Sequence, residues 1–237
     1  MTATKILALV LAGGEGSRLY PLTAEHAKPA LPFAGGYRIV DFVLSNLVNS
    51  GISSIYVLAQ YKPQSLIQHI RAAWAHSSRS PERFVNVVLP KTEAESRCFK
   101  GTSDAVYQNL HLVERHRPDL VAVFAADHIY RMDVRQMVRC HVERGADVSI
   151  AAVPVPVEKA SPFGIIVTGS DGRVTDFQEK PDRPAPIPAE PKRAYASMGN
   201  YLFNPRVLAE LLQQAHQQNI KSTFDDEAIY SHAASAT

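Results

Sequence analysis

The sequence predicts an α/β fold: a mostly parallel, Rossmann-like sheet with helices on both faces and a β-rich flap on one side. Apolar runs of strand length alternate with segments of helical spacing through residue 155. Apolar runs without polar alternation are typical of buried parallel strands. After about residue 160 the pattern changes to a hairpin and a proline-rich stretch. We expect a single domain over residues 1–237.

The first elements alternate between strand and helix. Residues 5–11 are predicted to form a buried strand, followed by a helix over 41–51 and a second strand at 54–59. Gly51 suits the position just after a helix C-terminus. Pro63 marks the start of the next helix, which continues to Trp74 with its apolar side chains along one face.

The alternation continues toward the middle of the chain. Thr102 or Ser103 is the expected N-cap of its helix, and Gly145 is expected to close another. The segments are a strand at 84–90, one helix over 102–116, a strand at 119–127, a helix at 134–145 and a strand at 147–155.

The last third of the chain predicts the flap. Residues 164–180 form two strands around an Asp-Gly turn and therefore a hairpin. The proline-rich residues 181–193 indicate an extended surface loop. A strand at 195–203 and a helix that begins at Pro205 complete the prediction.

Composition narrows the class of protein. The 237 residues are 46% hydrophobic and 20% charged, and 25 basic against 23 acidic residues leave a formal charge of +2. This charge is scattered, so we expect no nucleic-acid partner. No apolar run is long enough to span a bilayer and no signal peptide is evident, so we expect no membrane partner. Cys98 and Cys140 have no metal-binding spacing, and a cytoplasmic location is expected.

A glycine-rich loop follows the first predicted strand. Gly13, Gly14 and Gly16 let backbone N–H groups approach an anion, and the Arg18 guanidinium suits phosphate oxygens. The spacing matches neither the dinucleotide-binding fingerprint nor a P-loop. A flexible turn without a ligand is the alternative interpretation.

Charged residues follow other strands. Lys28 precedes Pro29, which predicts an extended segment and favours a second phosphate contact. Asp127 ends a buried strand, where a carboxylate suits Mg²⁺, although an N-cap is the alternative. Glu179 and Lys180 end the hairpin, a weak signal by itself. Together these residues indicate phosphoryl or nucleotidyl transfer.

Several motifs then add a resemblance. The segment LAGGEGSRLYPLT with AKPALPF resembles the signature loop of the sugar-nucleotide pyrophosphorylases. YRIVDFVLSNLVNSGI, QYKPQSLIQHI, KGTSDAVYQNL, ADHIY, VPVEKASPFGI, FQEKP and ASMGNYLF resemble, in order, the ADP-glucose pyrophosphorylase family, also called glucose-1-phosphate adenylyltransferases. The resemblance covers about residues 5 to 210 and implies a nucleotidyltransferase fold with a sugar-binding flap.

The resemblance implies that ATP and α-D-glucose 1-phosphate give ADP-glucose and pyrophosphate, with Mg²⁺, in glycogen or starch synthesis. It also implies a homo-oligomer. Matched by position, Gly13, Gly14 and Arg18 would hold the triphosphate with support from Lys28, and Asp127 would bind the metal. Gln60, Gly101 and Thr102 would lie at the adenine. Phe99, Gly164, Glu179, Lys180 and Ser197 would bind glucose 1-phosphate, with Lys180 at its phosphate and Glu179 at its hydroxyls.

The chain departs from the family pattern in four places. Cys98 and Phe99 replace an aromatic pair, and Glu25 and His26 replace a basic pair near the expected activator site. The C-terminal left-handed β-helix has no counterpart, so the catalytic domain is expected to be truncated after about residue 220. Thr223 stands where a second metal carboxylate is expected, with Asp225 and Asp226 close by. A non-catalytic ligand-binding subunit, or a pyrophosphorylase for another sugar nucleotide, are therefore the alternatives.

Overall fold

A computed structural model describes residues 4–74, 83–90 and 98–217. It contains an eight-stranded main sheet and a separate two-stranded sheet. One part of the main sheet is parallel, in the order β5-β4-β1-β6. Its strands are β1 (Ile6–Leu11), β4 (Ser54–Leu58), β5 (Phe84–Val88) and β6 (Leu120–Ala125).

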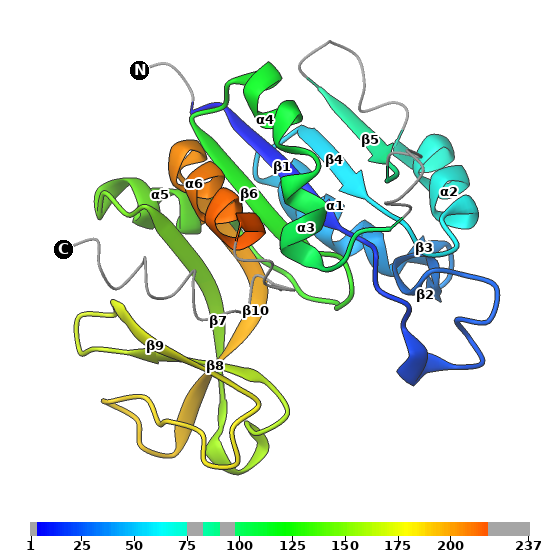
Figure 1. Cartoon of the computed structure of the whole chain (residues 1–237). Coiled ribbons are helices and arrows are strands. Elements are labelled where there is room, and N and C mark those ends of the chain that lie inside the picture. The colour runs from blue at the N-terminus through cyan, green and yellow to red at the C-terminus, as the bar shows by residue number, and fades with distance from the viewer. Residues whose placement is uncertain (1–3, 75–82, 91–97, 218–237) are drawn as a thin grey trace.

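Beyond β6 the main sheet becomes antiparallel and continues into the flap (Figure 1). The long strand β10 pairs with β6 and β7, and further along with β8, which pairs with β9. The predicted α/β fold, its parallel strands and its hairpin are therefore confirmed. These strands are β7 (Val148–Pro156), β8 (Gly164–Thr168), β9 (Val174–Glu179) and β10 (Arg193–Phe203).

Helices cover both faces of the main sheet, as the sequence predicts. One face packs against α1 (Ile39–Asn49), α2 (Gln64–Trp74) and α5 (Val134–Glu143). The other packs against α3 (Thr102–Tyr107), α4 (Leu110–His116) and α6 (Pro205–Gln217). Within β1, Ala8 and Val10 belong to the first core, whereas Leu7 and Leu9 belong to the second. The strand is buried on both sides, which explains its continuous apolar sequence.

The single helix predicted over 102–116 is wrong, because the chain forms α3 and α4 with a break between them. The Asn109 side chain donates to the carbonyl of Ala105 at 2.8 Å, the group that the Asn109 N–H would bond in a continuous helix. The Asn109 N–H instead donates to the carbonyl of Val106 at 3.0 Å. The predicted N-cap is also wrong, because α3 begins at Thr102 and its N-cap is Gly101.

The flap is an extension of the main sheet with a small core of its own. Its buried residues are Ala160, Ile165, Ala194 and Ala196. The predicted loop at 181–193 follows β9 and includes an isolated bridge between Ile187 and Glu190, but its last residue, Arg193, already belongs to β10. Between Ser197 and Tyr201 the pairing of β10 with β7 shifts register, at the point where β10 passes from the flap to the main sheet.

Short elements complete the chain. Turns of 3₁₀-helix lie at η1 (Ser17–Leu19), η2 (Lys28–Ala30) and η4 (Val157–Lys159), and β2 (Pro32–Phe33) pairs with β3 (Tyr37–Arg38). Thr223, Asp225 and Asp226 lie outside the described residues.

Candidate active site

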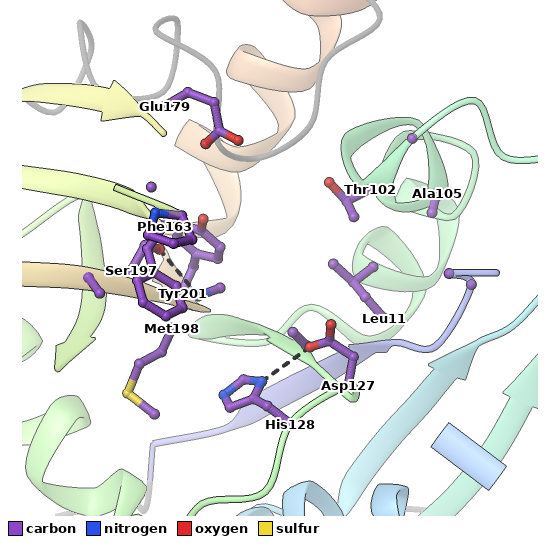
Figure 2. A pocket seen from close by; sticks show the side chains of 18 of the residues that line it. Leu11, Thr102, Ala105, Asp127, His128, Phe163, Glu179, Ser197, Met198 and Tyr201 are labelled. Carbon is purple, nitrogen blue, oxygen red and sulfur yellow. Dashed lines mark hydrogen bonds and ion pairs between the residues drawn. The ribbon is translucent and has the colours of Figure 1, made fainter. Parts of the chain in front are cut away.

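A cleft of about 980 Å³ lies between the ends of β1, β4 and β6 and the flap. Figure 2 shows Glu179, Phe163, Ser197 and Met198 on one side of it, and Thr102, Leu11 and Asp127 on the other. Of the residues that the resemblance assigns to the substrates and the metal, all but Lys28 line this cleft. They are Gly13, Gly14, Arg18, Gln60, Phe99, Gly101, Thr102, Asp127, Gly164, Glu179, Lys180 and Ser197.

The glycine loop directly follows β1, and its Gly14 and Gly16 have different surroundings. A side chain at Gly14 would meet nothing within 4 Å, so its backbone is open. Gly16 has φ +67, and a Cβ there would lie 2.9 Å from Lys28 Cβ and 3.0 Å from Thr23 Cγ2. The Thr23 hydroxyl also donates to the Gly16 carbonyl at 3.1 Å. Gly16 therefore holds the far end of the loop, whereas Gly14 leaves its near end free for an anion. Arg18, in η1, is exposed.

Two side chains that follow β4 brace this loop. The Gln60 amide donates to the carbonyls of Gly13 at 3.4 Å and Phe99 at 3.3 Å, and its oxygen accepts from the Phe99 N–H at 2.6 Å. Lys62 donates to the backbone carbonyls of Thr23 and Ala24. The Gln60 amide is thus engaged with the backbone of both Gly13 and Phe99, and its predicted contact with adenine stays a prediction.

Lys28 lies behind the cleft and contacts the carboxylate of Asp127. Its Nζ is 3.2 Å from Asp127 Oδ2, while His128 Nδ1 is 3.2 Å from Oδ1. The hydrogen bond from His128, followed by the charge of Lys28, lowers the pKa of Asp127 to about 2. The carboxylate is therefore ionised at neutral pH, and its side chain is 56% exposed.

The extended segment predicted at Lys28 is wrong. Lys28 is the first residue of η2, and its carbonyl accepts the N–H of Leu31 at 3.1 Å. Pro29 is compatible with this turn because the first residues of a helix do not need their N–H groups for internal bonds. The residue with extended angles is Ala27.

Helix α1 fixes the loop that carries Asp127. The buried Asn46 side chain donates to the Tyr130 carbonyl at 3.0 Å and accepts from the Met132 N–H at 3.1 Å. One turn further along, the Ser50 hydroxyl accepts the Val134 N–H at 2.9 Å. These bonds satisfy backbone groups that belong to no strand, and they set the path of the loop between β6 and α5.

The flap contributes the opposite wall of the cleft. Glu179 and Lys180 form an ion pair at the end of β9. Lys180 has φ +46 and its N–H donates to the carbonyl of Phe163 at 3.2 Å. A Cβ at Gly164 would lie 2.5 Å from Phe177 Cζ and 3.2 Å from Glu179 Oε2. Glycine at this position therefore leaves room for the ring and the carboxylate.

Sequence reasoning missed several residues of the cleft. Phe163 and Met198 adjoin predicted residues on the flap, and His128 stacks on Tyr130 with ring centroids 4.5 Å apart. The ADHIY motif contains both rings, but a stacked pair two residues apart in a loop has no periodic signal. Asn46 was equally hidden, since it occupies one position on an amphipathic helix.

The donor set of the cleft limits how a metal could bind. Among the described residues no three His, Cys, Asp or Glu side chains gather as a metal site. Asp127 is an exposed, ionised carboxylate at the cleft. Mg²⁺ is commonly held by one or two carboxylates with substrate phosphates and water, so this arrangement fits a metal that is shared with a nucleotide.

An open glycine loop after the first strand and an ionised carboxylate in the same cleft, at the usual ligand edge of an α/β sheet, form an arrangement that suits a phosphate ligand. In agreement, the chain belongs to the nucleotidyl transferase family, whose sequence model matches residues 7–235. The structure and the match thus agree on the class of protein.

Curated relatives make the comparison more specific. The chain is 55% identical to the glucose-1-phosphate adenylyltransferase of Thermodesulfovibrio yellowstonii, over 90% of this chain and 52% of that protein. Identity is 51% to the enzyme of that name in Thermus thermophilus, with the same coverage. Identity is 43% to glucose-1-phosphate adenylyltransferase 1 of Vibrio parahaemolyticus, over 94% of this chain and 55% of that protein. The chain spans about half the length of these relatives.

No helix in the described part of the chain combines the length and the apolar character that a membrane crossing requires.

Proposed function

We propose that this chain carries the catalytic cleft that forms ADP-glucose and pyrophosphate from ATP and α-D-glucose 1-phosphate, with Mg²⁺. The observation that carries this proposal is that one cleft joins the open glycine loop, the Asp127 carboxylate and the Glu179–Lys180 pair. The names of the relatives supply the substrates. The reaction belongs to glycogen or starch synthesis, and we place the protein in the cytoplasm.

The glycine loop side of the cleft suits the nucleotide. Gly14 leaves its backbone open to phosphate oxygens, and Arg18 lines the same space with a permanent positive charge. Gly101 and Thr102 line the cleft where α3 begins and are proposed to lie at the adenine. Gln60 would support the base by holding Gly13 and Phe99 together.

The flap side suits the sugar phosphate. The Lys180 ammonium would bind the phosphate of glucose 1-phosphate, and Glu179 would accept hydrogen bonds from sugar hydroxyls. Ser197 lines the same side, and Phe99, whose backbone bonds to Gln60, is proposed to complete the sugar-phosphate site. The ion pair between Glu179 and Lys180 holds each group near the other before substrate arrives.

Asp127 would hold Mg²⁺ together with phosphate oxygens. When bound, the ion would neutralise phosphate charge and help to align the reacting groups. The low pKa of Asp127 keeps a negative charge available at the cleft. Lys28 is 3.2 Å from this carboxylate and can neutralise it when no cation is present.

The chemistry then requires mainly alignment and charge neutralisation. A phosphate oxygen of glucose 1-phosphate attacks the α-phosphorus of ATP, and the bond to the β-phosphate oxygen breaks, so that pyrophosphate leaves. Arg18 would stabilise the charge on the leaving group, with support from Lys28 through its contact with Asp127, and Lys180 would hold the attacking phosphate. No covalent intermediate with the chain is proposed.

The scattered charge of +2 gives no reason to propose a nucleic-acid partner. A homo-oligomer is proposed from the resemblance alone.

A non-catalytic ligand-binding role is the second candidate. It is favoured by the single carboxylate at the metal position among the described residues. One experiment separates the two. Pyrophosphate release is measured with ATP, UTP or dTTP and several sugar 1-phosphates, beside binding of labelled ATP. Release with ATP and glucose 1-phosphate supports the proposal, whereas binding of ATP without release selects the second candidate. Preference for another pair would assign a different pyrophosphorylase.

A further inference from the structure

Phe163 is a large aromatic side chain left open at the wall of the cleft. It is 45% exposed, and Ile129 and Val153, exposed at 40% and 44%, line the same cleft. Large exposed apolar groups are informative when they gather in a hollow, because binding sites combine apolar walls with a few polar groups. The polar groups on this side are Glu179, Lys180 and Ser197.

The backbone ties Phe163 directly to the proposed sugar-phosphate residues. Its carbonyl accepts the N–H of Lys180 at 3.2 Å, so the two residues are directly joined where β9 ends. Gly164 follows in sequence and has no space for a side chain beside Phe177 and Glu179. The backbone that carries the phenyl ring is therefore joined to the backbone that carries the Glu179–Lys180 pair.

We propose that Phe163 contributes to sugar binding by stacking against the C–H face of the hexose ring. This inference rests on the proposed function. In α-D-glucose 1-phosphate the hydroxyls at C2, C3 and C4 are equatorial, so the ring faces expose C–H bonds while the hydroxyls point outward. An aromatic face can then cover one ring face while Glu179 accepts hydrogen bonds at the rim. Phosphate alone offers no such face, so the ring would contribute to sugar binding and not to phosphate binding.

Phe33 offers a matched control. It is 44% exposed, nearly the same as Phe163, but it lies in β2 and does not line the cleft. Both rings can be changed to leucine, which keeps an apolar side chain of similar size and removes only the aromatic face. Phe163→Trp keeps an aromatic face and should retain binding. Because Phe163 is half exposed, thermal unfolding of each variant should stay close to that of the unchanged chain, and this is checked first.

The 237-residue chain is titrated with α-D-glucose 1-phosphate and, separately, with inorganic phosphate. Binding of each ligand is monitored by ligand-observed ³¹P NMR. We expect Phe163→Leu to weaken glucose 1-phosphate binding about tenfold, within the range that an aromatic contact adds beyond buried area, and to leave phosphate binding unchanged. Phe33→Leu should change neither.

Three other results would overturn the inference. If Phe163→Leu binds glucose 1-phosphate as tightly as the unchanged chain, the ring does not contact the sugar, and the proposed function is unaffected. If both ligands weaken equally, Phe163 acts through Lys180 and not through stacking. If the unchanged chain binds no glucose 1-phosphate while it still binds phosphate, the proposed function itself is wrong, and the role of Phe163 with it.

Discussion

Gly16→Ala should be markedly more destabilising than Gly51→Ala, although both glycines have left-handed backbone angles. Gly16 has φ +67 and Gly51 has φ +85. An alanine in this region costs about 1–2 kcal/mol at either position. The two sites differ in space, because a Cβ at Gly51 meets nothing within 4 Å, whereas a Cβ at Gly16 lies 2.9 Å from Lys28 Cβ.

The difference in the free energy of unfolding between the two variants measures the crowding around a Cβ at Gly16. Overpacking of this kind costs about 1–3 kcal/mol, so Gly16→Ala should lose about 2–5 kcal/mol in total. For a chain of this size each kcal/mol corresponds to about 2–4 °C in Tm. Thermal unfolding followed by circular dichroism should therefore place Gly16→Ala about 2–12 °C below Gly51→Ala.

The same pair of variants has a functional readout. Movement of Lys28 and Thr23 away from Gly16 should disturb the loop proposed to bind the triphosphate, and so weaken labelled ATP binding in Gly16→Ala alone. Equal Tm values for the two variants, or equal loss of ATP binding, would refute the idea that Gly16 is required for close packing against Lys28.

Three further predictions concern single residues. Asp127→Asn should lower Mg²⁺-dependent turnover by orders of magnitude and leave the fold intact; normal turnover would remove Asp127 from the metal site. Lys180→Ala should raise the KM for glucose 1-phosphate far more than that for ATP, and a rise mainly for ATP would assign the flap to the other substrate. Burial lowers the pKa of His141, which contacts Ser149 Oγ at 2.9 Å. The folded state then binds fewer protons than the unfolded chain, so the free energy of unfolding should fall as pH drops below about 6.5. His141→Gln should reduce that slope without abolishing it, because His116 has a pKa lowered mainly by burial; a slope that His141→Gln leaves unchanged in urea titrations would contradict this.

Elements with strong periodicity could be predicted from the sequence alone. The strand at 6–11 packs against helices on both sides, and its uninterrupted apolar run reflects that burial. Helix ends marked by Gly51 and Gly145 were equally clear, since both have the positive φ that glycine tolerates. The break at Asn109 was missed because it depends on one side-chain hydrogen bond to Ala105, which leaves the apolar spacing intact.

The candidate site could be predicted where residues directly follow strands. Gly13, Gly14 and Asp127 come just after β1 and β6, and parallel strands bring their ends to one edge. Phe163 gave no such signal, because its significance depends on exposure within a hollow that only the folded flap forms. Asn46 is similar, since its bonds reach residues more than eighty positions away in the sequence.

Direct transfer between two substrates in one cleft can be tested by isotope exchange. The 237-residue chain is incubated with ³²P-labelled pyrophosphate and Mg²⁺, either with ADP-glucose or with unlabelled ATP and no sugar phosphate. In-line transfer without a covalent intermediate predicts labelled ATP only when ADP-glucose is present, and none with Asp127→Asn. Label entering ATP without any sugar would reveal an adenylylated chain and contradict direct transfer. No label under either condition, with ATP binding intact, would show that the cleft binds nucleotide without catalysing the reaction.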